Sequence, residues 1–401
     1  MSASTPAGAP LRPLQRALVY ASAFFGITTE SLIGMLLPLW ALDRGLPPAQ
    51  LGIAVALASL SPLLLAVPAG ALCDRYGDRR IMLWAGLGAG VTAALYPLAG
   101  GFWTACGLQL FGGLARSMSW LSAQSYAIRA TPAGERNSFM GRFSFAGSIG
   151  MLLAPLAAGA LVSWLGLGAG FLLMAIWGGA LTLVALPLPD IRDHERVGTL
   201  WQVTGGAYRQ ALPLLGQAAL MIVMLLTLLR LSSAAVNASF YPVHLDQIGF
   251  SAARIGLMFA CINGAISLGS LLAAQMIRRS SMTSVLFGSI ALSVVSISAI
   301  PFVAAPLAVG LLSALHGLGL GLSLPTLLAA IGRQTAPSQR GLVIGLRTLF
   351  NRLGYFAVPV LLGGMVHGLG LRGAFVATGA LLLAGLAGTY AYLRRSRLTY
   401  D

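Results

Sequence analysis

Long apolar runs, separated by short charged stretches and by prolines and glycines, recur along this chain. Each run is long enough for a helix of about 20 residues, the length that crosses the core of a bilayer. The short alternating segments typical of membrane strands are not seen. The pattern predicts an all-α polytopic membrane protein with twelve membrane-spanning helices, at residues 16–41, 49–70, 80–100, 102–128, 142–164, 169–187, 213–241, 253–276, 283–304, 307–331, 341–366 and 372–393.

The C-terminal half of the sequence repeats features of the N-terminal half at an offset of 204 residues. The segment LPLWALDRGLPPAQLG, which starts at Leu37, aligns without a gap with YPVHLDQIGFSAARIG, which starts at Tyr241. Glycines, prolines and one loop arginine recur at the aligned positions, among them Pro38 with Pro242, Gly45 with Gly249, Gly52 with Gly256, Arg136 with Arg340, Gly150 with Gly354, Pro155 with Pro359, and Gly159 with Gly363. The repeat predicts two pseudo-symmetric halves of six helices, residues 1–187 and 213–401. The charged segment 188–212 between them is expected to be a cytoplasmic linker.

Composition agrees with a membrane protein and excludes several other classes. Hydrophobic residues make up 57% of the 401 and charged residues 9%, which is too little polar surface for a soluble chain of this length. The net charge of +15 comes from arginines scattered over many loops, whereas a nucleic-acid-binding face would cluster them. The sequence contains no lysine, so it lacks the P-loop of an ATP-driven pump. We therefore expect no cofactor, no metal site, no nucleic-acid partner and no enzymatic activity.

The arginines are distributed unequally between the two sets of predicted loops. Those on the side of the N-terminus hold most of them, whereas the opposite loops hold only Arg44, Arg254 and Arg372. Because loops rich in arginine stay on the cytoplasmic side, both termini are expected to be cytoplasmic. The chain is accordingly predicted to be a monomer embedded in the lipid bilayer of the cytoplasmic (inner) membrane.

The loop between the second and third predicted helices reads GALCDRYGDRRI and carries a pattern of glycines, an acid and basic residues. These are Gly70, Asp74, Arg75, Gly77, Arg79 and Arg80. Together with the predicted six-plus-six arrangement, this pattern resembles the major facilitator superfamily. The resemblance implies a transporter of small molecules, in which Asp74 packs at the cytoplasmic start of the eleventh helix and helps to switch between open states, with Arg347 as a candidate partner. Asp78 departs from the family pattern, which usually has a basic residue there.

The fifth predicted helix contains GSIGMLLAPLAAG, with Gly150, Pro155 and Gly159. This segment is similar to the glycine-proline motif of the proton-driven antiporter, or efflux, branch of the superfamily. Small residues at this spacing also allow close helix packing in any membrane bundle, so both interpretations stay open. The family's fourth-helix arginine is not clearly present: Gln109 stands about where it belongs, and Arg116 lies two turns further along.

Ionisable side chains inside a bilayer are costly, so each one in a predicted span is a functional candidate. Glu30, the only carboxylate well inside a span, is the candidate for proton coupling, although a permanent pair with an arginine is the alternative. Arg230 aligns one turn before Glu30 in the repeat, so both are expected on the corresponding face of the first helix of their half. The resemblance implies that these two helices line a central cavity, which the two residues would face from opposite halves. The remaining cavity candidates are polar or charged residues at mid-depth: Arg116, Asn237, His316 and Arg352.

The buried arginines outnumber the single carboxylate, which favours an anionic substrate because arginine binds carboxylates through two hydrogen bonds. The alternative for each arginine is a structural bond to a hydroxyl or a carbonyl group. The sequence therefore predicts a secondary active transporter that works by alternating access. Proton-coupled export of a small organic compound, including an anionic one, is the first hypothesis. Proton-coupled or facilitative uptake of an organic anion is the second.

Overall fold

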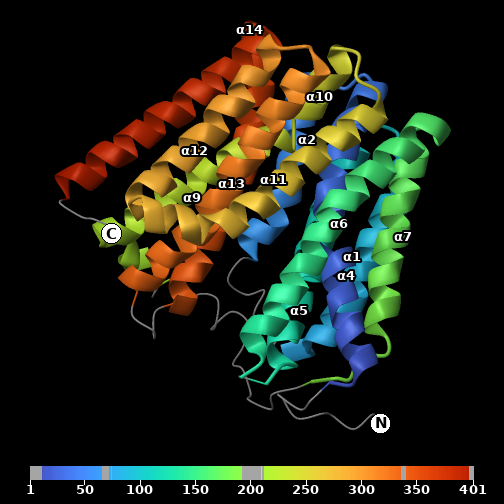
Figure 1. Ribbon diagram of the computed structural model, residues 1–401. Helices are drawn as coiled ribbons and strands as arrows, with labels where there is room; N and C mark the ends of the chain where they lie inside the picture. The colour runs from blue at the N-terminus through green and yellow to red at the C-terminus, as the bar shows by residue number, and fades with distance from the viewer. Residues whose placement is uncertain are drawn as a thin grey trace.

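The structure, a computed structural model, describes residues 11–65, 72–73, 75–132, 134–191, 209, 212–335 and 340–396. These residues are almost entirely helical (Figure 1). The helices are α1 (Pro13–Asp43), α2 (Pro48–Leu64), α4 (Asp78–Leu95), α5 (Phe102–Arg129), α6 (Arg136–Leu165), α7 (Leu167–Ala185), α9 (Ala218–Asn237), α10 (Tyr241–Gln247), α11 (Ala252–Arg279), α12 (Met282–Ala299), α13 (Pro306–Gln334) and α14 (Arg340–Arg395).

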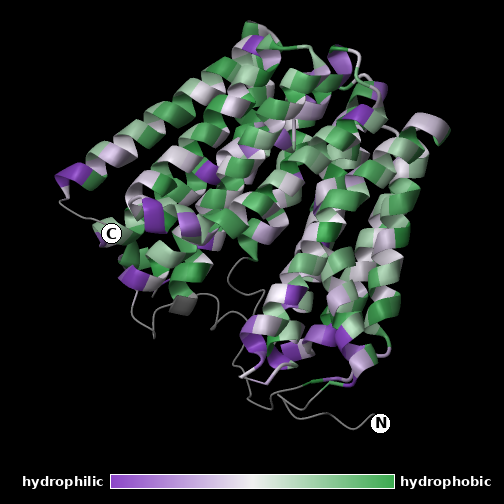
Figure 2. Cartoon of the chain, in the orientation of Figure 1, coloured by the Kyte–Doolittle hydropathy of each residue, from purple (hydrophilic) through white to green (hydrophobic). Residues whose placement is uncertain are grey.

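Within the described residues, nine helices are long and apolar enough to cross a membrane. Three features of the helices explain why this number is lower than the twelve predicted spans. Helix α2 has only 17 residues, α5 carries many polar side chains, and α14 runs through two predicted spans, with its one non-helical residue at Gly370 (φ 66°). Hydrophobic residues cover most of the helix surfaces, and many of the hydrophilic ones lie near helix ends (Figure 2).

The helices form two groups. Helices α1 to α7 pack mainly on one another, and α9 to α14 do the same. Between the groups the extensive contacts are those of α2 with α14 and of α6 with α11. The ribbons of the two groups meet near α10 and spread apart toward the ends that carry the chain termini (Figure 1). We call the two contact regions the α2/α14 seam and the α6/α11 seam.

Both seams are built from residues that the sequence repeat aligns. A Cβ atom on Gly256 of α11 would lie 2.2 Å from the carbonyl oxygen of Pro155 in α6. At the aligned positions, a Cβ atom on Gly52 of α2 would lie 2.2 Å from the carbonyl oxygen of Pro359 in α14. Such distances are far below van der Waals contact, so these backbones approach each other only because glycine has no side chain.

The α6/α11 seam also contains a polar contact that depends on a proline. Pro155 has no N–H group, so it leaves the carbonyl oxygen of Met151, one turn earlier in α6, without its helical donor. The side-chain amide of Asn263 on α11 donates to that oxygen at 2.8 Å and also approaches the hydroxyl of Ser31 on α1 at 3.4 Å. Asn263 is 7% exposed, so this bond lies in a largely dry interface. A membrane interior leaves few other partners for the freed carbonyl.

Candidate functional site

Both helix groups contribute side chains to a central cavity of about 270 Å³. Its polar lining residues come from α1, α2 and α5 on one side and from α14 on the other: Glu30, Ser59, Gln109, Asn351, Arg352 and Tyr355. Apolar side chains complete the wall, including Ile33, Leu37, Val55 and Leu231. The cavity therefore offers a ligand both charged or polar groups and apolar side chains.

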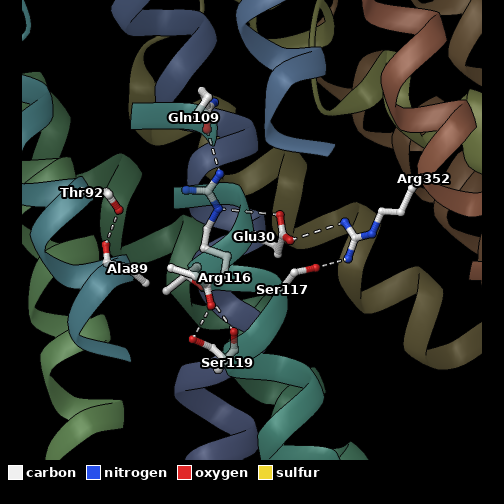
Figure 3. A network of polar contacts seen from close by, with 11 residues as sticks. Glu30, Ala89, Thr92, Gln109, Arg116, Ser117, Ser119 and Arg352 are labelled. Atoms are coloured by element: carbon white, nitrogen blue, oxygen red, sulfur yellow. Dashed lines mark hydrogen bonds and ion pairs between the residues drawn. The ribbon is translucent and has the colours of Figure 1, made fainter. Parts of the chain in front are cut away.

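Glu30 lies between two arginines from different helix groups (Figure 3). Its Oε2 atom is 3.9 Å from Nε of Arg116 on α5, and its Oε1 atom is 3.8 Å from Nη1 of Arg352 on α14. These separations are ion-pair distances, longer than the 2.7–3.2 Å of a hydrogen bond. The Glu30 side chain is 37% exposed, so it remains accessible from the cavity while both cations attract it.

Arg116 is fully buried, and its guanidinium group points back along its own helix. The Nη2 atom donates to Oε1 of Gln109 at 2.7 Å, two turns earlier in α5. Gly112 makes room for it, because a Cβ atom there would lie 2.7 Å from Nη1 of Arg116. Long helical side chains point toward the helix N-terminus. A glycine four residues before a buried arginine is therefore the sequence signal that could have predicted this conformation.

Arg116 thus brings a guanidinium group to Gln109, the position at which the fourth-helix arginine of the family was expected. In the sequence Arg116 lies two turns beyond this position, so the spacing along the backbone alone did not relate the two residues. The side chains of Arg116 and Gln109 together span the two turns that separate the residues.

Arg352 connects the two helix groups. Its Nη2 atom donates to the hydroxyl of Ser117 on α5 at 2.6 Å, in addition to the ion pair with Glu30 on α1. The arginine is part of the second group, whereas both of its partners belong to the first. A change in the charge of Glu30 therefore alters an attraction between the groups.

Arg230 is bound inside the second group and does not pair with Glu30. Its Nε atom donates to the hydroxyl of Ser323 at 2.9 Å, and its Nη2 atom donates to the carbonyl oxygen of Leu320 at 3.0 Å. Both acceptors lie on α13. The repeat predicted that Arg230 faces the cavity, but Arg230 is not among the described residues that line it. Its long side chain reaches acceptors on a neighbouring helix, which lowers the cost of burying its charge.

Like Arg116 and Arg230, the candidates His316 and Asn237 are not among the described residues that line the cavity, whereas Arg352 is. His316 of α13 is fully buried, and its Nδ1 atom lies 2.9 Å from the hydroxyl and 3.0 Å from the carbonyl oxygen of Ser293 on α12. This is the structural contact expected as the alternative for a lone membrane histidine. Asn237 is the last residue of α9.

Two residues of the family-like loop, Gly70 and Asp74, lie outside the described residues. The predicted pairing of Asp74 with Arg347 therefore also lies outside them and stays a prediction. Gly77, directly before α4, has a φ of 86°, a conformation that favours glycine. Arg75 is exposed, with its guanidinium group 5.7 Å from the ring centroid of Tyr76.

The charged residues at the start of α4 bind other parts of the first helix group. Arg79 donates to the carbonyl oxygens of Ala185 and Leu186 at the end of α7. Asp78, the departure from the family pattern, is 1% exposed and forms an ion pair with Arg129 at 3.3 Å. Arg80 lies 3.9 Å from Asp190. The loop's basic pair therefore joins the start of α4 to the end of α7.

A substitution at Gly112 tests whether the orientation of Arg116 controls ligand binding. In the Gly112→Ala variant the new methyl group meets the end of a flexible side chain, so the guanidinium group moves while the backbone of α5 stays in place. We expect a roughly tenfold weaker affinity for any ligand of the cavity, since one charge-assisted hydrogen bond is worth about 1.5–3 kcal/mol. Ligand-dependent shifts in melting temperature measure the effect. An unchanged affinity would show that Arg116 does not contact the ligand.

Comparison with known proteins identifies the family. The model of the Major Facilitator Superfamily matches residues 19–228 and 222–399. Among curated proteins, the chain is 21% identical to a protein named "Multi-drug resistance efflux pump PmrA homolog" from Lactococcus lactis, over 94% of each chain. It is 22% identical to the "Multidrug resistance protein MdtG" of Escherichia coli, over 82% of this chain and 81% of that protein.

Solved transporter structures have the same fold at low sequence identity. The nucleoside transporter NupG matches with a TM-score of 0.79 and 12% identity, over 95% of this chain and 99% of that one. A bacterial homologue of the human lysosomal transporter Spinster, in an inward-facing and unoccupied conformation, matches with a TM-score of 0.76 and 15% identity, over 96% and 98%. A D-xylose-proton symporter gives 0.72 and 15%, over 94% and 97%. With family matches that together span most of its length, this chain belongs to the Major Facilitator Superfamily and is a membrane transporter, not an enzyme.

Proposed function

We propose that this protein is a proton-coupled secondary transporter of a small organic compound and that Glu30 takes up and releases the proton. The observation that carries this proposal is the position of the Glu30 carboxylate, which faces the cavity between Arg116 of one helix group and Arg352 of the other. A carboxylate in such a site has two charge states with very different attractions to its neighbours. Its protonation therefore changes both the charge of the cavity and the attraction between the groups.

In this mechanism residues 1–187 and 213–401 move as two bodies around the cavity, and residues 188–212 connect them. Alternating access of this kind opens a site near the bilayer midplane to one side of the membrane at a time. The glycine-lined α2/α14 and α6/α11 seams close one end of the cavity. We place both termini on the cytoplasmic side of the inner membrane, which makes the seam end the outer one, and the protein acts as a monomer.

Export is the first candidate for the direction of transport. It is supported by the likeness to proteins named as multidrug efflux pumps. Uptake of an organic anion is the second candidate, and one specific observation favours it: Arg352 lines the cavity, and the buried Arg116 adds a second positive charge beside the single carboxylate of Glu30. A bulky cationic drug would meet this excess positive charge in a cavity of only about 270 Å³.

Transport measurements on a Glu30→Gln variant test the proposal. A thermal-shift screen of organic anions, cations and neutral drugs first identifies a ligand, which is then used in proteoliposomes under an imposed proton gradient. Wild-type protein is expected to accumulate the ligand, whereas Glu30→Gln is expected to lose at least about 90% of the accumulation and retain ligand exchange without a gradient. Glu135→Gln, in an exposed carboxylate that pairs with Arg16, is the matched control. Accumulation by Glu30→Gln at the wild-type level would contradict the proposal.

A further inference from the structure

We propose that Glu30 occupies the binding site of the substrate's own anionic group, so that an organic anion binds by displacing Glu30 from the two arginines. The displaced carboxylate then takes up a proton from water. This inference rests on the proposed transport function, in which Glu30 is the proton-binding residue. It goes further by assigning the chemical class of the ligand and the order of events in the site, in which the anion binds first and Glu30 is then protonated.

The contacts of Glu30 are those of a group that can be displaced. The carboxylate is held at 3.9 Å and 3.8 Å by charge attraction, and among the described residues it forms no hydrogen bond with either guanidinium group. Arg116 is fully buried, yet its Nε and Nη1 atoms have no hydrogen-bond acceptor in the described part of the chain. Of these two donors, Nε faces Glu30 and Nη1 lies beside Gly112, so Nε is the unused donor that a better-placed anion at the Glu30 position would fill.

The two arginines are already oriented for such an anion. Nη2 of Arg116 is held by Gln109, and Nη2 of Arg352 is held by Ser117, so both guanidinium groups are fixed by protein acceptors on one edge (Figure 3). Nε of Arg116 and Nη1 of Arg352 are directed toward Glu30, whereas Nη1 of Arg116 lies beside Gly112. A ligand carboxylate between them would form charge-assisted hydrogen bonds of about 2.7–2.9 Å, shorter and stronger than the present ion pairs.

Charge explains why a proton follows the anion. If both Glu30 and the ligand stayed ionised, two carboxylates would share one small cavity, and the displaced Glu30 would have lost its cations. Like charge and the loss of a counter-ion both favour the neutral form of a carboxyl group. Formation of the O–H bond on Glu30 removes this repulsion and leaves the cavity with the same net positive charge as before.

The cavity limits the ligand to a small organic monoanion with an apolar body. A group the size of a carboxylate fits between the arginines, and the apolar wall formed by Ile33, Leu37, Val55 and Leu231 faces the rest of the molecule. A cation would instead have to bind Glu30 beside two guanidinium groups. The anion and its proton enter the site together and cross the membrane in the same direction, which favours the uptake candidate under an inward proton gradient.

Three probes of nearly equal shape test this assignment by equilibrium binding to purified protein. We choose benzoate, benzamide and benzamidinium, which are an anion, a neutral compound and a cation. Benzoate is expected to bind at least about tenfold more tightly than the other two. Its affinity for the wild-type protein is expected to rise as the pH falls, by up to about tenfold per pH unit where Glu30 is ionised in the empty site and benzoate remains ionised.

The Glu30→Gln variant removes the competing charge, so it is expected to bind benzoate tightly at every pH in this range. Glu135→Gln is expected to keep the wild-type pH dependence, and Arg352→Gln is expected to lose benzoate binding. A preference of the wild-type protein for benzamidinium or benzamide, equal responses to all three probes, or a wild-type affinity for benzoate that does not change with pH would overturn the inference.

Because these measurements are made without a membrane, the two proposals can fail separately. A preference for benzamidinium, combined with loss of gradient-driven accumulation in Glu30→Gln, would leave proton coupling intact and remove the anion site. Binding of benzoate with a proton, combined with full accumulation by Glu30→Gln in proteoliposomes, would leave the anion site intact and contradict the role of Glu30 in coupled transport.

Discussion

Replacing Gly256 with alanine is expected to shift the protein away from the conformation described, by about 5- to 150-fold in the equilibrium between closed and open seams. The new Cβ atom would lie 2.2 Å from the carbonyl oxygen of Pro155, a backbone atom that cannot rotate away. Overpacking of this kind costs about 1–3 kcal/mol, which corresponds to that change in the equilibrium. The contact lies between the two helix groups, so the cost falls on closing the α6/α11 seam and not on the folding of either group.

A cysteine pair across the seam measures this shift. The hydroxyl of Ser163 on α6 accepts a hydrogen bond from the backbone N–H of Ala253 on α11 at 2.9 Å, so these positions are adjacent when the seam is closed. Disulfide formation between Ser163→Cys and Ala253→Cys, with the native cysteines replaced by serine, is expected to slow markedly in Gly256→Ala. Gly288→Ala is the matched control, because a Cβ atom on that helical glycine meets nothing within 4 Å. Equal rates in the two variants would show that Gly256 does not set the position of the seam.

Much of the fold could be predicted from the sequence because a bilayer imposes a simple pattern. Most described residues of each predicted apolar run are helical, and the exceptions lie at or near helix ends. The boundary predicted between residues 366 and 372 contains Gly370, the non-helical residue within α14. The 204-residue repeat also aligned Gly52 with Gly256 and Pro155 with Pro359, the residues that form the two seams. What the repeat could not predict was that each glycine contacts the proline of the opposite group.

The candidate site could be predicted in part. Glu30, Arg116 and Arg352 were recognisable because a charge inside a membrane needs a partner or a function. The contacts of Arg230 could not be derived, since they depend on how α9 and α13 are rotated against each other, which no pattern along a single helix specifies. Asn263 was missed for a different reason. The sequence does show that Pro155 leaves one carbonyl group of its helix without a donor. Identifying Asn263 as the donor required knowledge of how α6 packs against α11.

The second large effect is expected for the proton that accompanies ligand binding. If Glu30 is released from Arg116 and Arg352 when an anion binds, the wild-type protein takes up about one proton per ligand at a pH where Glu30 is ionised in the empty site. Without the carboxylate, the Glu30→Gln variant has no such proton to gain. The change from about one proton to none is a qualitative difference, and it requires neither a membrane nor a proton gradient.

Calorimetric titration of purified protein with benzoate, in buffers that differ in their heat of ionisation, tests this account most directly. The difference in binding heat between buffers gives the number of protons exchanged. We predict uptake of about one proton by the wild-type protein and by Glu135→Gln, and none by Glu30→Gln. Release of a proton by the wild-type protein, or equal uptake by Glu30→Gln, would contradict the claim that Glu30 couples protons to the ligand.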